Sequence, residues 1–398
     1  MPGPLDGYRI VDLTTVISGP FATMMLGDQG ADIIKVESTL APDHARGAGY
    51  GDNQFTATFL NNNRNKRAIA LNLKEEEGRQ VLFKLLAGAD VLIQNFRPGV
   101  VERLGIDETA VRKVAPDIIY ASISGFGEKG PWTHKPVYDP IVQALSGLTT
   151  IQAGSDDERP RLVRTILPDK LTGMTMAQAI TAALLARAKT GKGQHVRVSM
   201  LDAVIAFLWS SDMGGQTFVG KEVSNQRAAT FIDLIYETKD NYISVSVMTN
   251  KQWHAFCDAV EQPEWKADER FKTPALRDKY ANERLQLIQS ALIRKPAATW
   301  LTLLDEAGVP CAPVLKRKEI MHHPQVMASE LIIETDHPVA GRIRQTRPAA
   351  RFSDTRPEVR RGAPLHGEHT KEVLGEAGYS DTEISRLSDQ GIILNGAD

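Results

Sequence analysis

One carboxylate in the sequence is a candidate nucleophile. Asp169 follows Pro168 and precedes a long segment rich in Ala, Leu, Met and Thr, so it lies at the expected start of a helix. A helix N-terminus favours the ionised form of a carboxylic acid, and an ionised carboxylate can attack a carbonyl carbon. Thr172 and Gly173 leave room for a bulky acyl group. The competing interpretation is a simple N-cap, which is the common role of Asp before a helix.

Cationic side chains gather between residues 64 and 103, several of them beside asparagines. Arg can bind phosphate oxygens through two hydrogen bonds, Lys acts as a point charge, and Asn can both donate to and accept from an adenine or an amide. The set suits a polyphosphate ligand, and a solvated surface is the other interpretation. The residues are Arg64, Lys66, Arg67, Lys74, Arg97 and Arg103, with Asn63, Asn65, Asn72 and Asn95.

Two turns follow apolar segments of strand length. The first, residues 14–20, bends at Gly19-Pro20 and enters a helix, so it is either a site where backbone amides meet a phosphate-bearing ligand or an ordinary turn. The second, Gly125-Phe-Gly-Glu-Lys-Gly130, has the spacing of a dinucleotide fingerprint, but Pro131 and Pro136 interrupt the helix that should follow. We therefore interpret the second as a flexible loop or a surface turn and not as a nicotinamide site.

Other kinds of catalytic site lack their residues. There is no Gly-x-Ser-x-Gly motif, and Cys257 and Cys311 lie in apolar surroundings that indicate structural roles. His322-His323 has no third ligand at a suitable spacing, so we assign no metal site. Two cysteines without a CxxC motif exclude a disulfide framework and fit a reducing compartment.

Composition narrows the class of protein. The 398 residues are 42% hydrophobic and 24% charged, which is typical of a globular enzyme and excludes a disordered or fibrous chain. The net charge of −2 gives no overall attraction to nucleic acid or to an anionic membrane. Residues 1–8 show no basic segment followed by an apolar one, and no run of about 18 apolar residues occurs. We expect a cytoplasmic protein with neither nucleic-acid nor membrane partners.

The elements that must position these residues alternate along the first half of the chain. Apolar segments predict strands, and segments of helical period predict helices between them. The pattern favours an α/β fold with a parallel sheet covered on both faces and with ligand residues in the loops after the strands. The predicted strands are 8–13, 32–36, 90–94, 117–123 and 195–200, and the predicted helices are 21–28, 78–87, 108–114, 170–189 and one from 201.

The pattern changes after residue 210 and indicates a second, smaller α+β domain. Residues 336–369, rich in Pro and Arg, predict an extended return across the first domain. Its seven arginines between Arg342 and Arg361 indicate either an anion-binding arm or a solvated basic surface. We place the large domain at 1–212, the small domain at 213–329 and the return that completes the large domain at 330–398. In the small domain we expect a strand at 242–247 and helices at 251–260, 282–294 and 297–307.

Taken together, the motifs resemble those of the family III coenzyme A transferases, also called the CaiB/BaiF family. The resemblance spans nearly the whole chain, and its specificity comes from the order of the motifs and not from any one of them. They are Asp12-Leu-Thr14, Gly19-Pro-Phe-Ala-Thr23, Leu26-Gly-Asp28, Gly30-Ala-Asp-Ile-Ile-Lys-Val-Glu37, Asn63-Arg-Asn-Lys-Arg67, Leu71-Asn-Leu-Lys74, Asn95-Phe-Arg-Pro-Gly99, Ser124-Gly-Phe-Gly127, Gly130-Pro131, Tyr138-Asp139, Asp169, Gly191-Lys-Gly-Gln194 and Pro364-Leu-His-Gly-Glu-His-Thr370.

The resemblance implies a fold and an activity. The fold is a Rossmann-like, doubly wound large domain with a smaller α+β domain, in an interlaced homodimer. The activity is transfer of CoA from an acyl-CoA thioester to a free carboxylic acid, through an aspartyl anhydride and an aspartyl-CoA thioester formed on Asp169. Coenzyme A and acyl-CoA are then substrates, and no cofactor is tightly bound. The implied CoA contacts are Val16, Ile17, Ser18, Asn72, Leu73, Lys74, Asn95, Phe96, Arg97 and Arg103, with Lys135, Tyr138 and Asp139 near the acyl end.

Departures from the family pattern bear on the substrate. Ser38 stands where some members have an Arg, and Pro136 stands where formyl-CoA transferases have a Lys, so that Lys135 is the nearest lysine. Residues 242–251 lack the glycine run of oxalate-acting members, which favours a larger acceptor such as a dicarboxylate or a carnitine-like acid.

Two alternatives stay open at this level. The first is an enzyme like the α-methylacyl-CoA racemases, which would need a His-Asp pair where this chain has Tyr138-Asp139. The second is a non-catalytic CoA-binding subunit of a heteromer, although the presence of Asp169 favours a catalytic chain.

Overall fold

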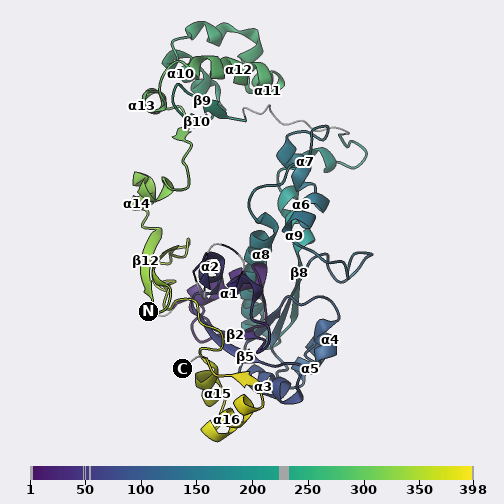
Figure 1. Cartoon of the computed structure of the whole chain (residues 1–398). Coiled ribbons are helices and arrows are strands. Elements are labelled where there is room, and N and C mark those ends of the chain that lie inside the picture. The colour runs from purple at the N-terminus through teal and green to yellow at the C-terminus, as the bar shows by residue number, and fades with distance from the viewer. Residues whose placement is uncertain (1–2, 48, 50, 53–54, 224–232, 397–398) are drawn as a thin grey trace. The chain divides into compact units, whose positions relative to one another are not determined.

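The computed structural model describes residues 3–396 apart from residues 48, 50, 53–54 and 224–232 (Figure 1). The prediction that residues 1–8 contain no leader pattern includes Met1 and Pro2, which lie outside the described residues. The chain divides into two compact units. The first comprises residues 1–149, 162–214 and 330–398, and the second comprises residues 150–161 and 215–329.

A seven-stranded sheet forms the centre of the first unit, in the order β14-β5-β2-β1-β6-β7-β8. From β1 the chain builds outward through β2 to β5, then returns to the other side of β1 and adds β6, β7 and β8. The direction in which successive strands are added therefore reverses between β1 and β6, although these two strands are parallel. Doubly wound sheets bind their ligands at such a reversal of strand order. The parallel strands are β1 (Arg9–Asp12), β2 (Asp32–Glu37), β5 (Lys66–Leu71), β6 (Val91–Gln94), β7 (Ile119–Ser124) and β8 (His195–Ser199), and β14 (Ile393–Leu394) is antiparallel to β5. The predicted α/β fold with a parallel sheet is confirmed.

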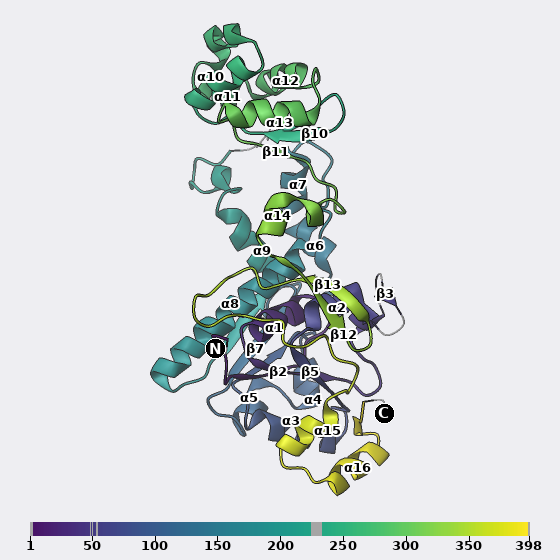
Figure 2. The same cartoon turned by 90° about the vertical axis from the view of Figure 1, so that its left-hand side faces the viewer.

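Helices cover both faces of this sheet because neighbouring residues along a strand point to opposite faces. Ile10 packs in one core with α1 (Ser18–Asp28) and α8 (Leu167–Thr190). Val11 packs in the other core with α3 (Glu76–Leu86), α15 (Thr370–Glu376) and α16 (Asp381–Asp389). Figure 2 shows α1 and α8 on one side of the strands and α3 and α15 on the other.

The close approach of α1 to α8 requires a glycine at position 173. A Cβ atom built there would lie 2.6 Å from the carbonyl oxygen of Ser18 and 3.0 Å from the Phe21 ring. Any larger residue would push the helices apart. Gly173, in the second turn of α8, therefore lets the start of α8 lie against the first turn of α1.

Three of the cations between residues 64 and 103 are held inside the first unit. Arg64 forms an ion pair with Asp28, and Arg67 forms ion pairs with Asp32, Glu372 and Glu376. The Lys66 ammonium is fully buried and donates to Asp12 (3.1 Å), to the Pro20 carbonyl (3.0 Å) and to Asn63 (2.9 Å). For these three cations, both the phosphate-ligand interpretation and the solvated-surface interpretation are wrong, because each neutralises a buried or partly buried carboxylate.

Residues 332–346 differ from the predicted extended return. They form an antiparallel hairpin of β12 (Ile332–His337) and β13 (Gly341–Thr346), in which Arg342 and Arg344 pair with Glu334. Residues 347–369 contain no helix or strand. The first unit also contains β3 (Gly51–Asp52), β4 (Phe55–Thr56), α2 (Ala57–Asn63), α4 (Val100–Leu104), α5 (Glu108–Arg112), α6 (Asp139–Leu145) and α9 (Met200–Trp209), and α7 (Leu148–Ala153) spans the division between the units.

The second unit is built on a three-stranded antiparallel sheet, β11-β10-β9, covered by helices. Its core contains Trp253, Phe256, Trp300 and Cys257. Burial raises the pKa of the Cys257 thiol to about 12, so that this thiol stays protonated and takes a structural role. The elements are β9 (Ile235–Glu237), β10 (Tyr242–Val245), α10 (Asn250–Ala259), α11 (Pro274–Lys279), α12 (Ala281–Leu292), α13 (Ala297–Glu306), β11 (Cys311–Pro313) and α14 (Pro324–Ala328). Across the described parts of both units, no helix has the length and apolar character needed to cross a membrane.

Replacing Lys66 with Met should destabilise the first unit strongly, because it removes a buried partner of Asp12. We expect the free energy of unfolding to fall by about 3–5 kcal/mol. Lys192, which is exposed, provides the control, and Lys192→Met should change the free energy by less than about 0.5 kcal/mol. Urea unfolding followed by circular dichroism measures both variants. Equal stability of the two would contradict the structural role of Lys66.

Candidate active site

The loop from β1 into α1 lies where the strand order reverses. The Thr15 N–H donates to the side-chain oxygen of Asn95 (3.0 Å), and the Asn95 amide group donates back to the Thr15 carbonyl (2.9 Å). Because Asn95 directly follows β6, these bonds join the loops after β1 and β6 at the sheet edge that the carboxyl ends of the parallel strands form. Two of the segments predicted to contact CoA, residues 16–18 and 95–97, are thus brought together.

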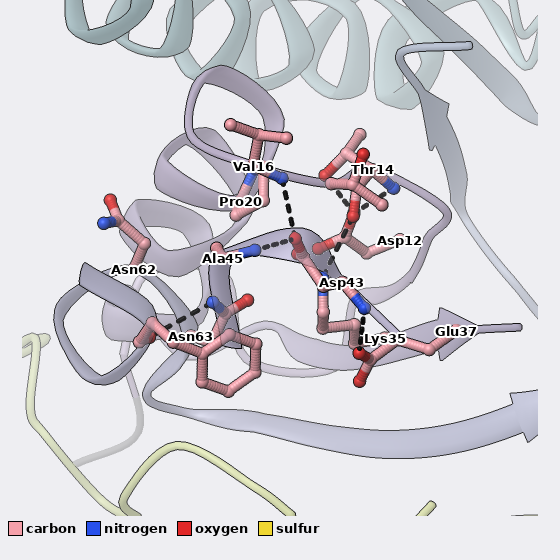
Figure 3. Close-up of polar contacts among 12 residues, drawn as sticks. Asp12, Thr14, Val16, Pro20, Lys35, Glu37, Asp43, Ala45, Asn62 and Asn63 are labelled. Carbon is pink, nitrogen blue, oxygen red and sulfur yellow. Dashed lines mark hydrogen bonds and ion pairs between the residues drawn. The ribbon is translucent and has the colours of Figure 1, made fainter. Parts of the chain in front are cut away.

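Val16 in this loop has an unusual backbone conformation. Its φ is +72°, in the left-handed region that β-branched residues rarely adopt. The Val16 N–H donates to Asp43 Oδ1 at 3.0 Å (Figure 3). Such backbone strain persists only where neighbouring groups hold it, and it is common at functional sites.

Fully paired buried charges lie beneath the loop. Lys35 Nζ donates to Asp43 Oδ2 (2.8 Å) and to the Thr14 carbonyl (2.9 Å), and the Thr14 N–H donates to Asp12 (2.8 Å; Figure 3). Burial alone would lower the pKa of Lys35, but the carboxylates of Asp43, Glu37 and Asp12 raise it above the ordinary value. Lys35 therefore remains a cation and holds both Asp43 and the loop.

Asp169 lies in the first turn of α8, beside the first turn of α1. Its side chain is half-buried, and its backbone N–H donates to Asp139 Oδ2 (3.4 Å). Burial raises the pKa of Asp169, and the charge of Asp139 raises it further. The hydroxyl and backbone N–H of Ser18 act in the opposite direction, and the resulting pKa is about 6. The carboxylate is therefore mostly ionised at neutral pH, yet more basic than an ordinary aspartate.

Asp139 and Gln143 hold the start of α8. Asp139 is only 4% exposed and accepts from the Gln143 amide group at 2.6 Å. Burial raises the pKa of Asp139, while Gln143 and the Asp169 N–H lower it. The Gln143 side-chain oxygen also accepts from the Val163 N–H (2.9 Å), and its amide group donates to the Val163 and Thr165 carbonyls (3.3 and 3.4 Å). Gln143 therefore holds the segment that leads into α8, and Asp139 holds the backbone of Asp169 itself.

The remaining predicted CoA contacts lie along the same sheet edge. Asn72 follows β5 and accepts from the Lys74 N–H (3.2 Å), with Leu73 half-buried between them. Phe96 follows β6 and donates its N–H to Gln94 (2.8 Å). Three of these residues, Lys74, Arg97 and Arg103, are exposed, and none forms an ion pair within the described parts of the chain. Their cationic groups are thus available to a ligand, unlike those of Arg64, Lys66 and Arg67.

The predicted contacts near the acyl end are divided. The structure brings Asp139 to Asp169, whereas Tyr138 is 71% exposed and has no described contact with Asp169. The Lys135 ammonium lies over the Trp132 ring, 3.4 Å from its centroid. These placements leave the roles of Lys135 and Tyr138 as predictions.

Sequence reasoning assigned no role to Lys35, which lies in one of the family motifs, and did not single out Asp43 or Gln143. One feature of the sequence indicates that Lys35 is buried, because it is a charged residue inside the apolar strand segment Ile33-Ile34-Lys35-Val36. Asp43 and Gln143 had no such feature, because their partners come from other elements. Among the described residues, no group of three or more His, Cys, Asp and Glu side chains could hold a metal ion.

The fold and site together define an α/β protein with a carboxylate nucleophile candidate near the ligand edge of a doubly wound sheet. The sequence model of CoA-transferase family III matches residues 5–370. The chain therefore belongs to the family III CoA-transferases and is an enzyme of that class, as the ordered motifs predicted.

Named relatives and a solved structure support this family assignment. The mouse succinyl-CoA:glutarate CoA-transferase is 34% identical over 98% of this chain and 90% of its own length. The acetyl-CoA:oxalate CoA-transferase of Acetobacter aceti is 38% identical over 84% of this chain and 86% of its own length. The crystal structure of a CaiB/BaiF family protein from Brucella suis superposes with a TM-score of 0.82 at 28% identity, covering 95% of this chain and all of the other (100%).

Asp169→Asn should stabilise the protein above pH 6. The pKa of Asp169 is about 6 in the folded state against 3.8 for an ordinary aspartate, so ionisation of this residue opposes folding at higher pH. We expect a gain of about 1–3 kcal/mol at pH 8 that disappears below about pH 4, where both states are protonated. Urea unfolding at the two pH values measures the gain, with Asp389→Asn on the surface as the control. An Asp169→Asn variant no more stable than wild type at pH 8 would show that ionisation of this carboxylate does not oppose folding.

Proposed function

We propose that this enzyme transfers CoA from an acyl-CoA thioester to a dicarboxylic acid, with Asp169 as the covalent nucleophile. The observation that carries the proposal is the partly buried, basic carboxylate of Asp169 next to Ser18 and Asp139. Relatives named for glutarate and oxalate support a dicarboxylate acceptor. The loop from β10 to α10 lacks a glycine run, which favours an acceptor larger than oxalate.

In the first half of the reaction, CoA is transferred from the donor to Asp169. Its carboxylate attacks the thioester carbonyl of the donor, the C–S bond breaks, and CoA leaves as a thiolate while a mixed anhydride forms. The thiolate then attacks the aspartyl carbonyl of this anhydride. The donor leaves as a free carboxylate, and an aspartyl-CoA thioester remains on the enzyme.

The second half runs the same steps toward the acceptor. One carboxylate of the acceptor attacks the aspartyl thioester, which releases the thiolate and forms a second anhydride. The thiolate attacks the acceptor's carbonyl in this anhydride, giving the new acyl-CoA and the free Asp169 carboxylate. No oxidant, reductant or tightly bound cofactor is needed, because each bond that breaks is replaced by an equivalent bond.

The side chains around Asp169 suit these steps. The raised pKa increases its basicity, while a pKa of about 6 still leaves most of the group ionised at pH 7. Ser18 begins α1, so its donors and the helix N-terminus can stabilise negative charge that develops beside Asp169. Asp139 contributes by raising the basicity of Asp169 and by fixing its backbone.

Coenzyme A is proposed to bind along the carboxyl edge of the sheet. Lys74, Arg97 and Arg103 would hold its phosphates, since they are exposed cations in the segments that follow β5 and β6. The backbone of residues 16–18, 72–73 and 95–96 would contact the nucleotide and the pantetheine arm. Lys135, Tyr138 and Asp139 would line the acyl end.

We also propose that the chain works as an interlaced homodimer. Large apolar side chains remain exposed along α6, α8 and α9 of the first unit, and apolar surface of this extent is usually covered by a partner. These side chains are Ile141, Leu145, Met174, Leu185, Phe207 and Trp209. The two free cysteines suit a cytoplasmic location, which is part of the same proposal.

Asp169→Ala should abolish transfer while the protein stays folded. We expect kcat to fall by more than about 1,000-fold, because the covalent route is lost, and the Kd for CoA to change less than about threefold. Mass spectrometry of transfer from succinyl-CoA to glutarate measures the rate, and calorimetry measures CoA binding. Asp389→Ala is the matched control. Undiminished turnover in Asp169→Ala would rule out the nucleophile.

Replacing Lys74, Arg97 or Arg103 singly with Gln should raise the KM for acyl-CoA by about 5–50-fold, as expected for the loss of one charge-assisted hydrogen bond. With an acyl-pantetheine donor, which lacks the nucleotide, each variant should match the wild type. Lys192→Gln controls for the loss of a surface charge. Equal losses with both donors would assign these residues to structure and not to phosphate binding.

A further inference from the structure

We propose that Asp43 is a positioning residue for the nucleophile. Its hydrogen bond with the Val16 N–H (Figure 3) holds Val16 in the left-handed conformation. That conformation in turn directs Ser18 toward Asp169. The inference rests on the proposed catalytic role of Asp169.

The Asp43 carboxylate is fixed by contacts on both oxygens. Oδ1 accepts from the N–H groups of Val16 and Ala45, each at 3.0 Å, and Oδ2 accepts from Lys35 at 2.8 Å. The side chain is fully buried. It cannot rotate without leaving a buried ammonium or a buried N–H unpaired, so it is a rigid acceptor for Val16.

The backbone of Asp43 is held as firmly as its side chain. Its N–H donates to Glu37 Oε1 (2.9 Å), and Glu37 is in turn paired with Arg46 (2.6 Å). Asp43 therefore presents its carboxylate from a fixed position beyond the end of β2. This fixed acceptor is what the strained Val16 backbone requires, because valine does not favour a φ of +72° by itself.

The conformation at Val16 determines where Ser18 lies. Ser18 is only two residues further on, at the first position of α1. The turn has no spare room, since a Cβ at Gly19 would lie 2.3 Å from the Thr14 side chain. A Val16 residue that relaxed to an extended conformation would redirect the chain at residues 17 and 18 and move both Ser18 donors away from Asp169.

A merely structural role predicts a different dependence on residue 16. If Asp43 only neutralised Lys35, replacing Asp43 would lower kcat by the same factor whatever residue occupied position 16. If Asp43 holds the left-handed backbone, replacing it should lower kcat much less when residue 16 is glycine, because glycine adopts that conformation without strain. A double-mutant cycle separates the two roles.

The experiment compares Asp43→Ala, which removes the acceptor of the Val16 N–H, in the wild-type and Val16→Gly backgrounds of the full-length enzyme. In the wild-type background we expect kcat to fall by about 10–100-fold, the range that a small misplacement of a reacting group produces, with a smaller change in the KM for acyl-CoA. In the Val16→Gly background the further loss should be less than about threefold. Equal losses in the two backgrounds would overturn the proposal.

The pH profile gives a readout that a structural role would not move. The side chains that shift the pKa of Asp169 are Ser18 from α1, which lowers it, and Asp139 from α6, which raises it. Asp43→Ala should withdraw the Ser18 donors and leave Asp139 in place. We expect the acid limb of kcat/KM to lie near pH 6 in the wild type, to move to higher pH in Asp43→Ala, and to be restored by adding Val16→Gly. An unmoved acid limb would count against the proposal.

Two further variants keep the test decisive. If Asp43→Ala does not fold, the same comparison is made with Lys35→Met added, which removes the unpaired buried ammonium. Asp169→Ala is measured alongside. Activity in Asp169→Ala would overturn the proposed function itself, whereas an inactive Asp169→Ala with background-independent losses at Asp43 would overturn only the positioning role.

Discussion

The β1–α1 loop rests on buried charges, and its conformation depends on their complete pairing. Asp12, Lys35, Asp43 and Lys66 are all buried, and each has an opposite charge within 3.1 Å. Removing one partner of a buried pair leaves a charge that water cannot solvate, at a cost of several kcal/mol. The pairs therefore add little net free energy of folding, but they raise the free energy of any other loop conformation. The single conformation that results fixes the position of Ser18 and the hydrogen bonds between Asn95 and Thr15.

From this loop the arrangement extends to the nucleophile. Ser18 begins α1, Gly173 lets α8 approach it, and Asp169 projects from the first turn of α8. The resulting environment disfavours the ionised carboxylate, because burial and Asp139 outweigh the Ser18 donors. A carboxylate with a raised pKa costs stability at neutral pH, and we regard this cost as the source of its reactivity. The fold tolerates it because α1 and α8 are anchored in a large apolar core.

The sequence allowed prediction of the elements with a clear apolar period, the α/β class and the position of Asp169 at a helix start. It did not reveal β5, because that strand begins with Lys66-Arg67 and looked like a cationic loop. The partners of these cations, Asp12, Asp32 and Glu376, are up to 309 residues away in sequence and become neighbours only in the fold. The same reason hid Asp43 and Gln143, whose importance depends on which backbone groups they reach.

The most direct test of the account is a crystal structure of the wild-type enzyme incubated with succinyl-CoA. Our account predicts a covalent bond from Asp169 to the CoA sulfur or to the acyl group. It also places the phosphates near Lys74, Arg97 and Arg103, and keeps Val16 at a φ near +72°. CoA bound away from the carboxyl edge of the sheet, or bound there with a different residue acylated, would contradict it.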